Sequence, residues 1–176
     1  MYYNMNAMEA AGVEAPKTWE EFETVTAPAL AAAGYIALSQ SHSPWIFVEN
    51  FMSRHNLPFA TNDNGYTGTD TQILANTPEL KMHWSHVKDW LDAGYYAYYG
   101  AAWGDNQTPF EEGKVAIWLG SSGSFGGLAQ LDLPFEFSAT YLPYWEAVTT
   151  EPTQTFIGGA ALFAMSGKSA EENKAT

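Results

Sequence analysis

The chain has 176 residues, of which 46% are hydrophobic and 15% aromatic, so it can bury a core and is not an intrinsically disordered segment. Seven Lys and Arg residues stand against 20 Asp and Glu residues, and the formal net charge of −13 argues against nucleic acid or an anionic membrane surface as a partner. The lack of cysteine excludes disulfides and thiolate chemistry.

The first forty residues predict short strands and capped helices. Thr18 followed by Glu21 is typical of a capping box, and the helix that it starts should run to about residue 33. Pro28 lies inside that helix and predicts a break or kink near Ala27. The other predicted elements here are a strand end at Tyr2–Asn4, a helix over residues 6–11 closed by Gly12, and a strand over residues 35–39.

Residues 43–70 form the most informative stretch. Pro44 and Trp45 should occupy the first turn of a helix, where proline costs no hydrogen bond. Apolar residues of roughly helical spacing follow, and a loop rich in Gly, Asn and Asp covers residues 62–70. Because an aromatic face would lie beside the free N–H groups of a helix end, this stretch is a candidate ligand-binding edge.

The second half of the chain predicts further alternation of helices and strands. Thr77 and Pro78 should begin an amphipathic helix whose apolar stripe is Leu80, Trp84, Val87, Trp90 and Leu91. The other predicted elements are a short helix over residues 109–112 capped by Thr108, a strand over 115–119, a helix from Ser121 to about residue 131, strands over 136–143 and 156–165, and a helix start at Ser169. Such alternation favours an α/β fold.

Several motifs together resemble a known family. They are W-x-x-x-E-N-F at residues 45–51, LPFA at 57–60 and N-G-Y-x-G-T-D at 64–70, with YYN, PKTW, SSGS and IGGA elsewhere in the same order. The chain thereby resembles, over essentially its whole length, the glycerol-3-phosphate-binding branch of the maltose-binding-like solute-binding proteins of ABC importers. One residue is inserted near Trp103 relative to that pattern.

The resemblance implies a periplasmic-binding-protein-like (type II) α/β lobe from an incomplete two-lobed receptor. Residues 1–157 would form most of the C-terminal lobe, and residues 158–176 a hinge strand and the start of the return to the N-terminal lobe. Residues 1–4 carry no export-signal pattern, which we interpret as the start of an internal fragment. We expect a monomeric, extracytoplasmic, non-enzymatic protein that binds glycerol-3-phosphate or a glycerophosphodiester, contacts ABC permease subunits and needs no metal or cofactor.

Four residues are candidate ligand contacts. The resemblance assigns Trp45 to an aromatic wall of the pocket, Ser121 to a pocket hydroxyl, and Gly159 to a backbone N–H that faces the ligand. His42 stands where the family has a second tryptophan, so it could contact the ligand or lie on a surface loop. Trp45 could instead pack between helices, Ser121 could be an ordinary helix cap, and Gly159 could serve a bulge or hinge.

Other constellations support weaker alternatives. His83 and His86 could hold a metal ion at i, i+3, but without a third ligand we interpret them as a solvated helix face. Asp105, Glu111 and Glu112 could serve a carbohydrate-active enzyme, although adjacent carboxylates on a short helix point apart. A receptor of the same fold for an oligosaccharide is the nearer alternative, since His42 alters the expected aromatic wall.

Overall fold

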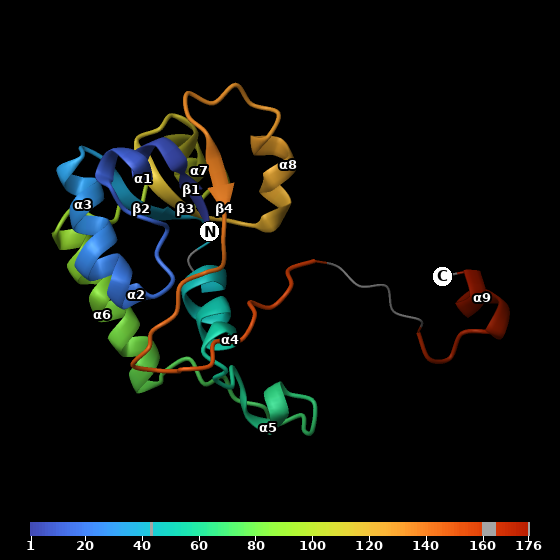
Figure 1. The fold of residues 1–176 in the computed structure, drawn as a ribbon. Coiled ribbons are helices and arrows are strands. Elements are labelled where there is room, and N and C mark those ends of the chain that lie inside the picture. Colours follow the sequence, from blue (N-terminus) through green and yellow to red (C-terminus); the bar gives the residue numbers. More distant parts are fainter. Residues whose placement is uncertain (43, 160–164, 176) are drawn as a thin grey trace.

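The computed structural model describes residues 1–42, 44–159 and 165–175. A four-stranded mixed sheet with strand order β2-β3-β1-β4 lies in the upper part of the molecule as drawn in Figure 1. β1 pairs antiparallel with β3 and β4, whereas β2 and β3 are parallel, with Leu38 opposite Ile117. The strands are β1 (Tyr2–Asn4), β2 (Ile36–Gln40), β3 (Val115–Leu119) and β4 (Phe137–Ala139).

Helices surround this sheet, and they confirm the expected α/β class. The α-helices are α1 (Met5–Ala11), α2 (Trp19–Glu21), α3 (Ala27–Ala32), α4 (Phe51–Arg54), α5 (Thr61–Asn64), α6 (Pro78–Asp92), α7 (Trp103–Glu111), α8 (Phe125–Leu128) and α9 (Ala170–Ala175). In the described part of the chain, two π-helical turns, η1 (Phe22–Thr26) and η2 (Pro44–Asn50), and one 3₁₀ turn, η3 (Ser122–Ser124), join some of them. None of the helices in the described ranges combines the length and apolar character needed to cross a bilayer.

The predicted irregularity before Pro28 takes the form of a π turn. Thr18 caps the helix as expected, since its hydroxyl accepts the N–H of Glu21 at 3.1 Å. The chain then stays helical through η1, in which the N–H of Ala27 bonds to the carbonyl of Phe22. Because proline has no N–H and its ring crowds the carbonyl four residues earlier, a widened turn accommodates it without ending the helix.

The core consists of two apolar clusters. Neighbouring residues of a strand point to opposite faces, and on β3 Ile117 joins the larger cluster whereas Trp118 joins the smaller one. The larger cluster is built with α1–α3, η2, α4 and α6, and the smaller one includes Phe110 of α7 and Leu128 of α8. The sheet is therefore covered on both faces, which holds the ends of β2 and β3 in fixed positions.

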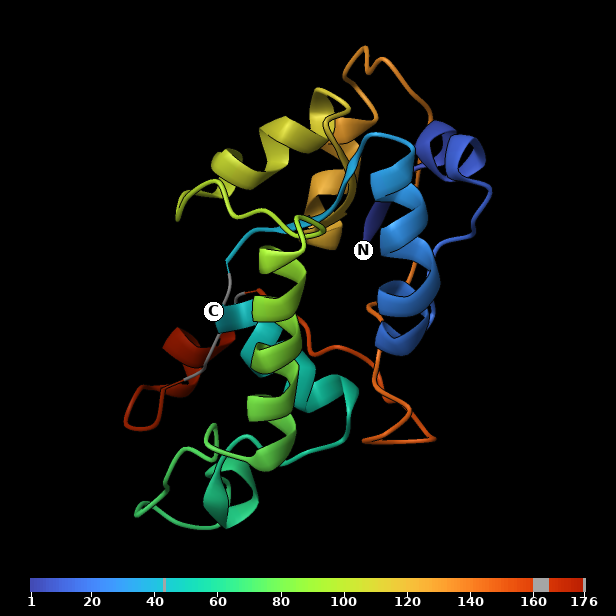
Figure 2. The same ribbon diagram turned by 90° about the vertical axis from the view of Figure 1, so that its left-hand side faces the viewer.

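Helix α6 buries three of the five residues of the predicted stripe. Its buried residues are Leu80, His83, Val87 and Trp90, whereas Trp84 is 39% and Leu91 is 51% exposed. The helix packs beside the α2–η1–α3 segment (Figure 2), where the carboxylate of Glu23 accepts the indole N–H of Trp90 at 2.8 Å. The spacing 80-83-87-90 is a helical stripe in its own right, in which His83 takes the place predicted for Trp84.

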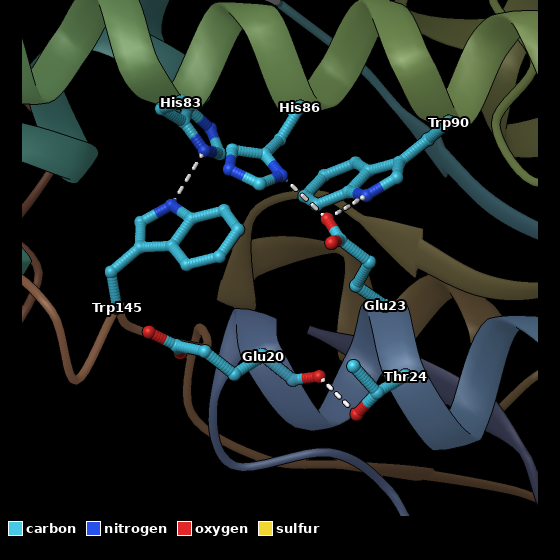
Figure 3. A network of polar contacts seen from close by, with 7 residues as sticks. All are labelled: Glu20, Glu23, Thr24, His83, His86, Trp90 and Trp145. Carbon is cyan, nitrogen blue, oxygen red and sulfur yellow. Dashed lines mark hydrogen bonds and ion pairs between the residues drawn. The ribbon is translucent and has the colours of Figure 1, made fainter.

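The interpretation of His83 as part of a solvated helix face is wrong. Its ring is fully buried, and Nδ1 accepts the indole N–H of Trp145 at 3.0 Å (Figure 3). His86 is half-buried and lies 2.6 Å from the carboxylate of Glu23. The two histidines thus join α6 to two different partners: His83 contacts the loop that carries Trp145, and His86 contacts the π turn η1.

Two predicted elements differ in extent. α7 begins at Trp103, six residues before the predicted start, because the carboxylate of Asp105 accepts the N–H of Ala102 and caps it there. Pro109 is an interior residue of that helix. β4 covers only Phe137–Ala139 of the predicted strand over 136–143.

The C-terminal part differs from the sequence-based expectation in one further respect. Residues 156–159 form no regular strand, and residues 160–164 of that predicted element lie outside the described ranges. Ser169 caps α9 as predicted: its hydroxyl accepts the N–H of Glu172, whose carboxylate accepts the N–H of Ser169. α9 lies apart from the sheet and its helices (Figure 1).

Candidate functional site

A cleft of about 540 Å³ opens beside the carboxyl end of β3. Its walls come from η2, the turn that begins at Ser121, the loop after β4 and residues 154–158. β2 and β3 are parallel and end together, with Gln40 opposite Leu119, so the chain leaves both strands at the same edge of the sheet. Segments far apart in sequence meet there for this reason, as at other α/β ligand sites.

Trp45 forms one wall of this cleft. It lies in the first turn of η2 and is half-buried, and its ring centroid is 6.4 Å from that of Phe156 in an edge-to-face arrangement. Gly158 passes close to the indole, since a methyl carbon at Gly158 would lie only 3.0 Å from it. The glycine therefore lets residues 154–158 pack against the ring and leaves its other surfaces to the cleft.

Ser121 stands on another wall of the same cleft. Its hydroxyl accepts the N–H of Gly123 at 3.2 Å, and its carbonyl accepts the phenol O–H of Tyr2 at 2.8 Å. Tyr2 comes from β1, the strand next to β3, so the sheet itself fixes the turn. The structure thus brings together two of the predicted contacts, Trp45 and Ser121, which are far apart in the sequence.

The close approach of Gly120 to Trp118 yields a prediction. A methyl carbon at Gly120 would lie 2.5 Å from the indole of Trp118, which is fully buried. We expect Gly120→Ala to lower the free energy of unfolding by about 1–3 kcal/mol, measured by thermal unfolding, because the ring cannot move aside. The matched control is Gly126→Ala in α8, where nothing lies within 4 Å and the change should be neutral or slightly stabilising. Equal stability of the two variants would contradict this account.

The other two predicted contacts lie at the margin of the cleft or beside it. Gly158 lines the cleft, whereas Gly159, the predicted contact, is its neighbour in sequence and is not among the lining residues. His42 adopts a left-handed backbone conformation with φ of 50°, and its ring centroid lies 4.9 Å from that of Trp103. It is exposed just beyond β2, at the same sheet edge as Ser121. The ligand roles of both remain predictions.

Sequence reasoning missed several residues that shape the cleft. Asn50 is buried, and its side-chain amide donates to the carbonyl of Trp45 at 3.1 Å, which fixes the start of η2. Tyr141 and Gln154 line the cleft from segments without regular structure. A buried asparagine on an apolar helix face was a detectable signal, whereas the loop residues carried none. Within the described residues, no acidic, basic or histidine side chain lines the cleft.

The carboxylates considered for an enzyme have other partners. Asp105 caps α7, Glu111 accepts the side-chain amide of Gln107 at 2.7 Å, and Glu112 lies 2.6 Å from Lys114. None of the three lines the cleft. In the described ranges no group of three or more His, Cys, Asp and Glu side chains is arranged to hold a metal ion.

Comparison with known proteins identifies similar sequences and folds. Residues 1–176 match the family described as bacterial extracellular solute-binding protein. The chain is 33% identical over 174 residues to the sn-glycerol-3-phosphate-binding periplasmic protein UgpB of Salmonella typhimurium, covering 97% of this chain and 39% of that protein. For the UgpB of Rhizobium meliloti the identity is 34% over 178 residues, covering 99% of this chain and 40% of that protein. The chain thus spans about two-fifths of the length of these relatives.

A solved structure shows the same fold. It is described as SBP RafE in complex with raffinose, and it superposes with a TM-score of 0.59 at 20% sequence identity. The superposition covers 81% of this chain and 39% of the RafE chain. At that identity the likeness concerns the fold alone, and it agrees with the predicted lobe of a solute-binding protein.

Proposed function

The chain belongs to the family of bacterial extracellular solute-binding proteins, and from that premise we propose that it is part of the receptor of an ABC importer for sn-glycerol-3-phosphate or a glycerophosphodiester. The relatives that carry the name of this ligand match nearly the whole chain. The observation that supports the proposal most directly is the meeting of Trp45 and Ser121 on one cleft. We expect the receptor to act outside the cytoplasm and to deliver its ligand to permease subunits.

The cleft offers chemistry suited to a small polyol ester. The indole of Trp45 can pack against the C–H groups of the glycerol backbone, and the Ser121 turn offers a hydroxyl and backbone N–H groups to its oxygens. We propose that residues 1–157 form most of one lobe, that residues 158–176 return toward a second lobe, and that closure of the two lobes traps the ligand. Charged contacts to the phosphate would come from that second lobe.

Replacing Trp45 tests this proposal. In the natural full-length gene product, Trp45→Ala should weaken binding of sn-glycerol-3-phosphate by on the order of 1–3 kcal/mol, because a stacked aromatic face is lost. Isothermal titration calorimetry measures the change, with Trp84→Ala as the control, since Trp84 is an exposed tryptophan on α6 away from the cleft. A dissociation constant that Trp45→Ala leaves unchanged would reduce this residue to a packing role.

A neutral oligosaccharide is the second candidate ligand. The described cleft walls carry no charged side chain, and His42 with Trp103 adds a mixed aromatic surface at the same sheet edge. Such a surface suits a sugar ring as well as a phosphate ester. Titrating the full-length product with raffinose and with sn-glycerol-3-phosphate separates the two classes: tighter binding of raffinose would replace the first proposal with the second.

A further inference from the structure

The only arginine of the sequence, Arg54, is buried at the end of α4 without a carboxylate partner among the described residues. It is 8% exposed, and its guanidinium lies 5.7 Å and 5.5 Å from the ring centroids of Tyr141 and Tyr144. A buried cation is costly unless hydrogen bonds and ring faces replace its water. The hydrogen-bond acceptors of Arg54 and the rings of Tyr141 and Tyr144 therefore stabilise the buried guanidinium.

The hydrogen bonds of Arg54 join two segments that are distant in sequence. Nε donates to the carbonyl of Leu142 at 2.9 Å, and Nη1 donates to the carbonyl of Thr153 at 2.5 Å. A planar guanidinium can serve two such acceptors in fixed directions, which the single ammonium of lysine on its flexible stem cannot do equally well. Arg54 thus sets the separation between Leu142 and Thr153.

Ser53 and the backbone of Arg54 strengthen the second of these attachments. The Ser53 hydroxyl donates to the carbonyl of Gln154 at 2.8 Å, and the N–H of Thr153 donates to the carbonyl of Arg54 at 3.0 Å. The hydroxyl of Thr153 donates to the carbonyl of Ser53 in return. The end of α4 therefore holds residues 153–154 through side-chain and main-chain bonds together.

Both attached segments continue directly into walls of the cleft. Tyr141, Leu142 and residues 154–158 line it, whereas the side chains of Ser53 and Arg54 do not. The segments have no regular strand over 140–158, and the strand-like attachments that they keep are a pair of main-chain bonds between Thr140 and Met1 and an isolated bridge at Tyr144. The bonds from α4 thus replace the strand ladder that would otherwise hold these walls.

We propose that Arg54 is a positioning residue for the cleft: it fixes the two strand-free walls at the separation that the ligand requires, without touching the ligand. The identity of that ligand rests on the proposed function, whereas the fixing of the walls rests on the geometry above. The inference assigns to Arg54 a role in affinity and not only in stability, because loosened walls must be ordered again when a ligand binds.

The test compares Arg54→Lys, Ser53→Ala and the control Lys81→Met in the natural full-length gene product. Lys81 is an exposed cation on α6, far in sequence from both walls. Amide hydrogen exchange without ligand should quicken by about tenfold in residues 149–158 for Arg54→Lys, with exchange in β3 and α6 unchanged, because one buried hydrogen bond is lost locally. The half-buried Ser53 carries no buried charge, so Ser53→Ala should fold and show a smaller change in the same residues.

Calorimetry with sn-glycerol-3-phosphate supplies the second measurement. Arg54→Lys should raise the dissociation constant by about tenfold, and Lys81→Met should leave it unchanged. Unaltered exchange in residues 149–158 for both wall variants, exchange that rises equally in β3, or an unchanged dissociation constant would each overturn the proposal. If the parent protein does not bind this ester, the proposed function fails, and the exchange data alone decide whether Arg54 fixes the walls.

Discussion

Replacing Trp118 with alanine is expected to lower the free energy of unfolding by about 3–5 kcal/mol. The indole is fully buried and stacks on Tyr2 with ring centroids 5.3 Å apart. Its N–H donates to the hydroxyl of Ser41 at 3.0 Å, so the truncation leaves both a cavity and a buried hydroxyl with one partner fewer. Urea denaturation followed by circular dichroism measures the loss.

Two companion variants separate the contributions of Trp118. Trp118→Phe keeps an aromatic ring against Tyr2 but loses the bond to Ser41, and it should cost less than half as much. Tyr66→Ala removes a side chain that is 90% exposed, and it should change the free energy of unfolding by no more than about 0.5 kcal/mol. A loss at Trp118 as small as that at Tyr66 would mean that the smaller apolar cluster does not stabilise the sheet.

The same residue connects stability with the cleft. Trp118 lies beneath Gly120, and its stacking partner Tyr2 donates to the carbonyl of Ser121. Loss of the indole should therefore loosen the turn that carries Ser121 as well as the core. The cleft wall at Ser121 therefore depends on the apolar packing under β3. For this reason, any variant near Ser121 needs a measurement of stability as a control.

Local signals in the sequence predicted the elements whose ends are fixed by residues nearby in the sequence. Thr18 and Thr77 cap their helices through the N–H three residues on, as their spacing indicated. The apolar run over β3 is a buried strand, as predicted. These features depend on residues within one turn or one strand, so the sequence alone contains the information that decides them.

A contact between distant residues explains one prediction that was wrong, and a local helix cap explains another. Without a third metal ligand we interpreted His83 as part of a solvated helix face, but its acceptor role for Trp145, 62 residues away, makes burial favourable. Pro109 suggested a helix start, but the cap from Asp105 placed the start earlier and left the proline within the helix. The partner of His83 is revealed only by the folded chain, whereas Asp105 lies three residues from Ala102 and was a capping signal within the sequence.

The site was only partly accessible to sequence reasoning. The family resemblance indicated Trp45 and Ser121, and the parallel ends of β2 and β3 place both on one cleft. Arg54 gave no such signal, because an isolated arginine in an apolar helix reads as a surface charge. Its role becomes visible only when the carbonyls of Leu142 and Thr153 are seen on either side of it.

Acidification from pH 7 to pH 5 is expected to lower the free energy of unfolding by about 2 kcal/mol through His83 alone. Burial lowers the pKa of His83 to about 3, from an ordinary value of 6.5, and the charges of His55 and His86 act in the same direction. Below pH 6.5 the unfolded chain therefore takes up a proton at His83, whereas in the folded chain this ring stays neutral. The contribution of His83 to the free energy of unfolding is complete above pH 6.5 and is lost progressively as the pH falls toward 3.

The hydrogen bonds of Trp145 oppose protonation of His83 in the folded state. Nδ1 of His83 accepts the indole N–H of Trp145 (Figure 3), and Nε2 of His55 accepts its backbone N–H at 2.7 Å, so a proton on either nitrogen would face another N–H. Burial also lowers the pKa of His55, which adds to the effect.

The variant His83→Asn keeps an acceptor near Nδ1 without a titrating ring. Although it is less stable overall, its free energy of unfolding should fall by about 2 kcal/mol less than that of the parent between pH 7 and pH 5. His42→Gln, which removes an exposed histidine, is the control in urea denaturation at both pH values. A His83→Asn variant that is as acid-sensitive as the parent would assign the pH dependence to other groups.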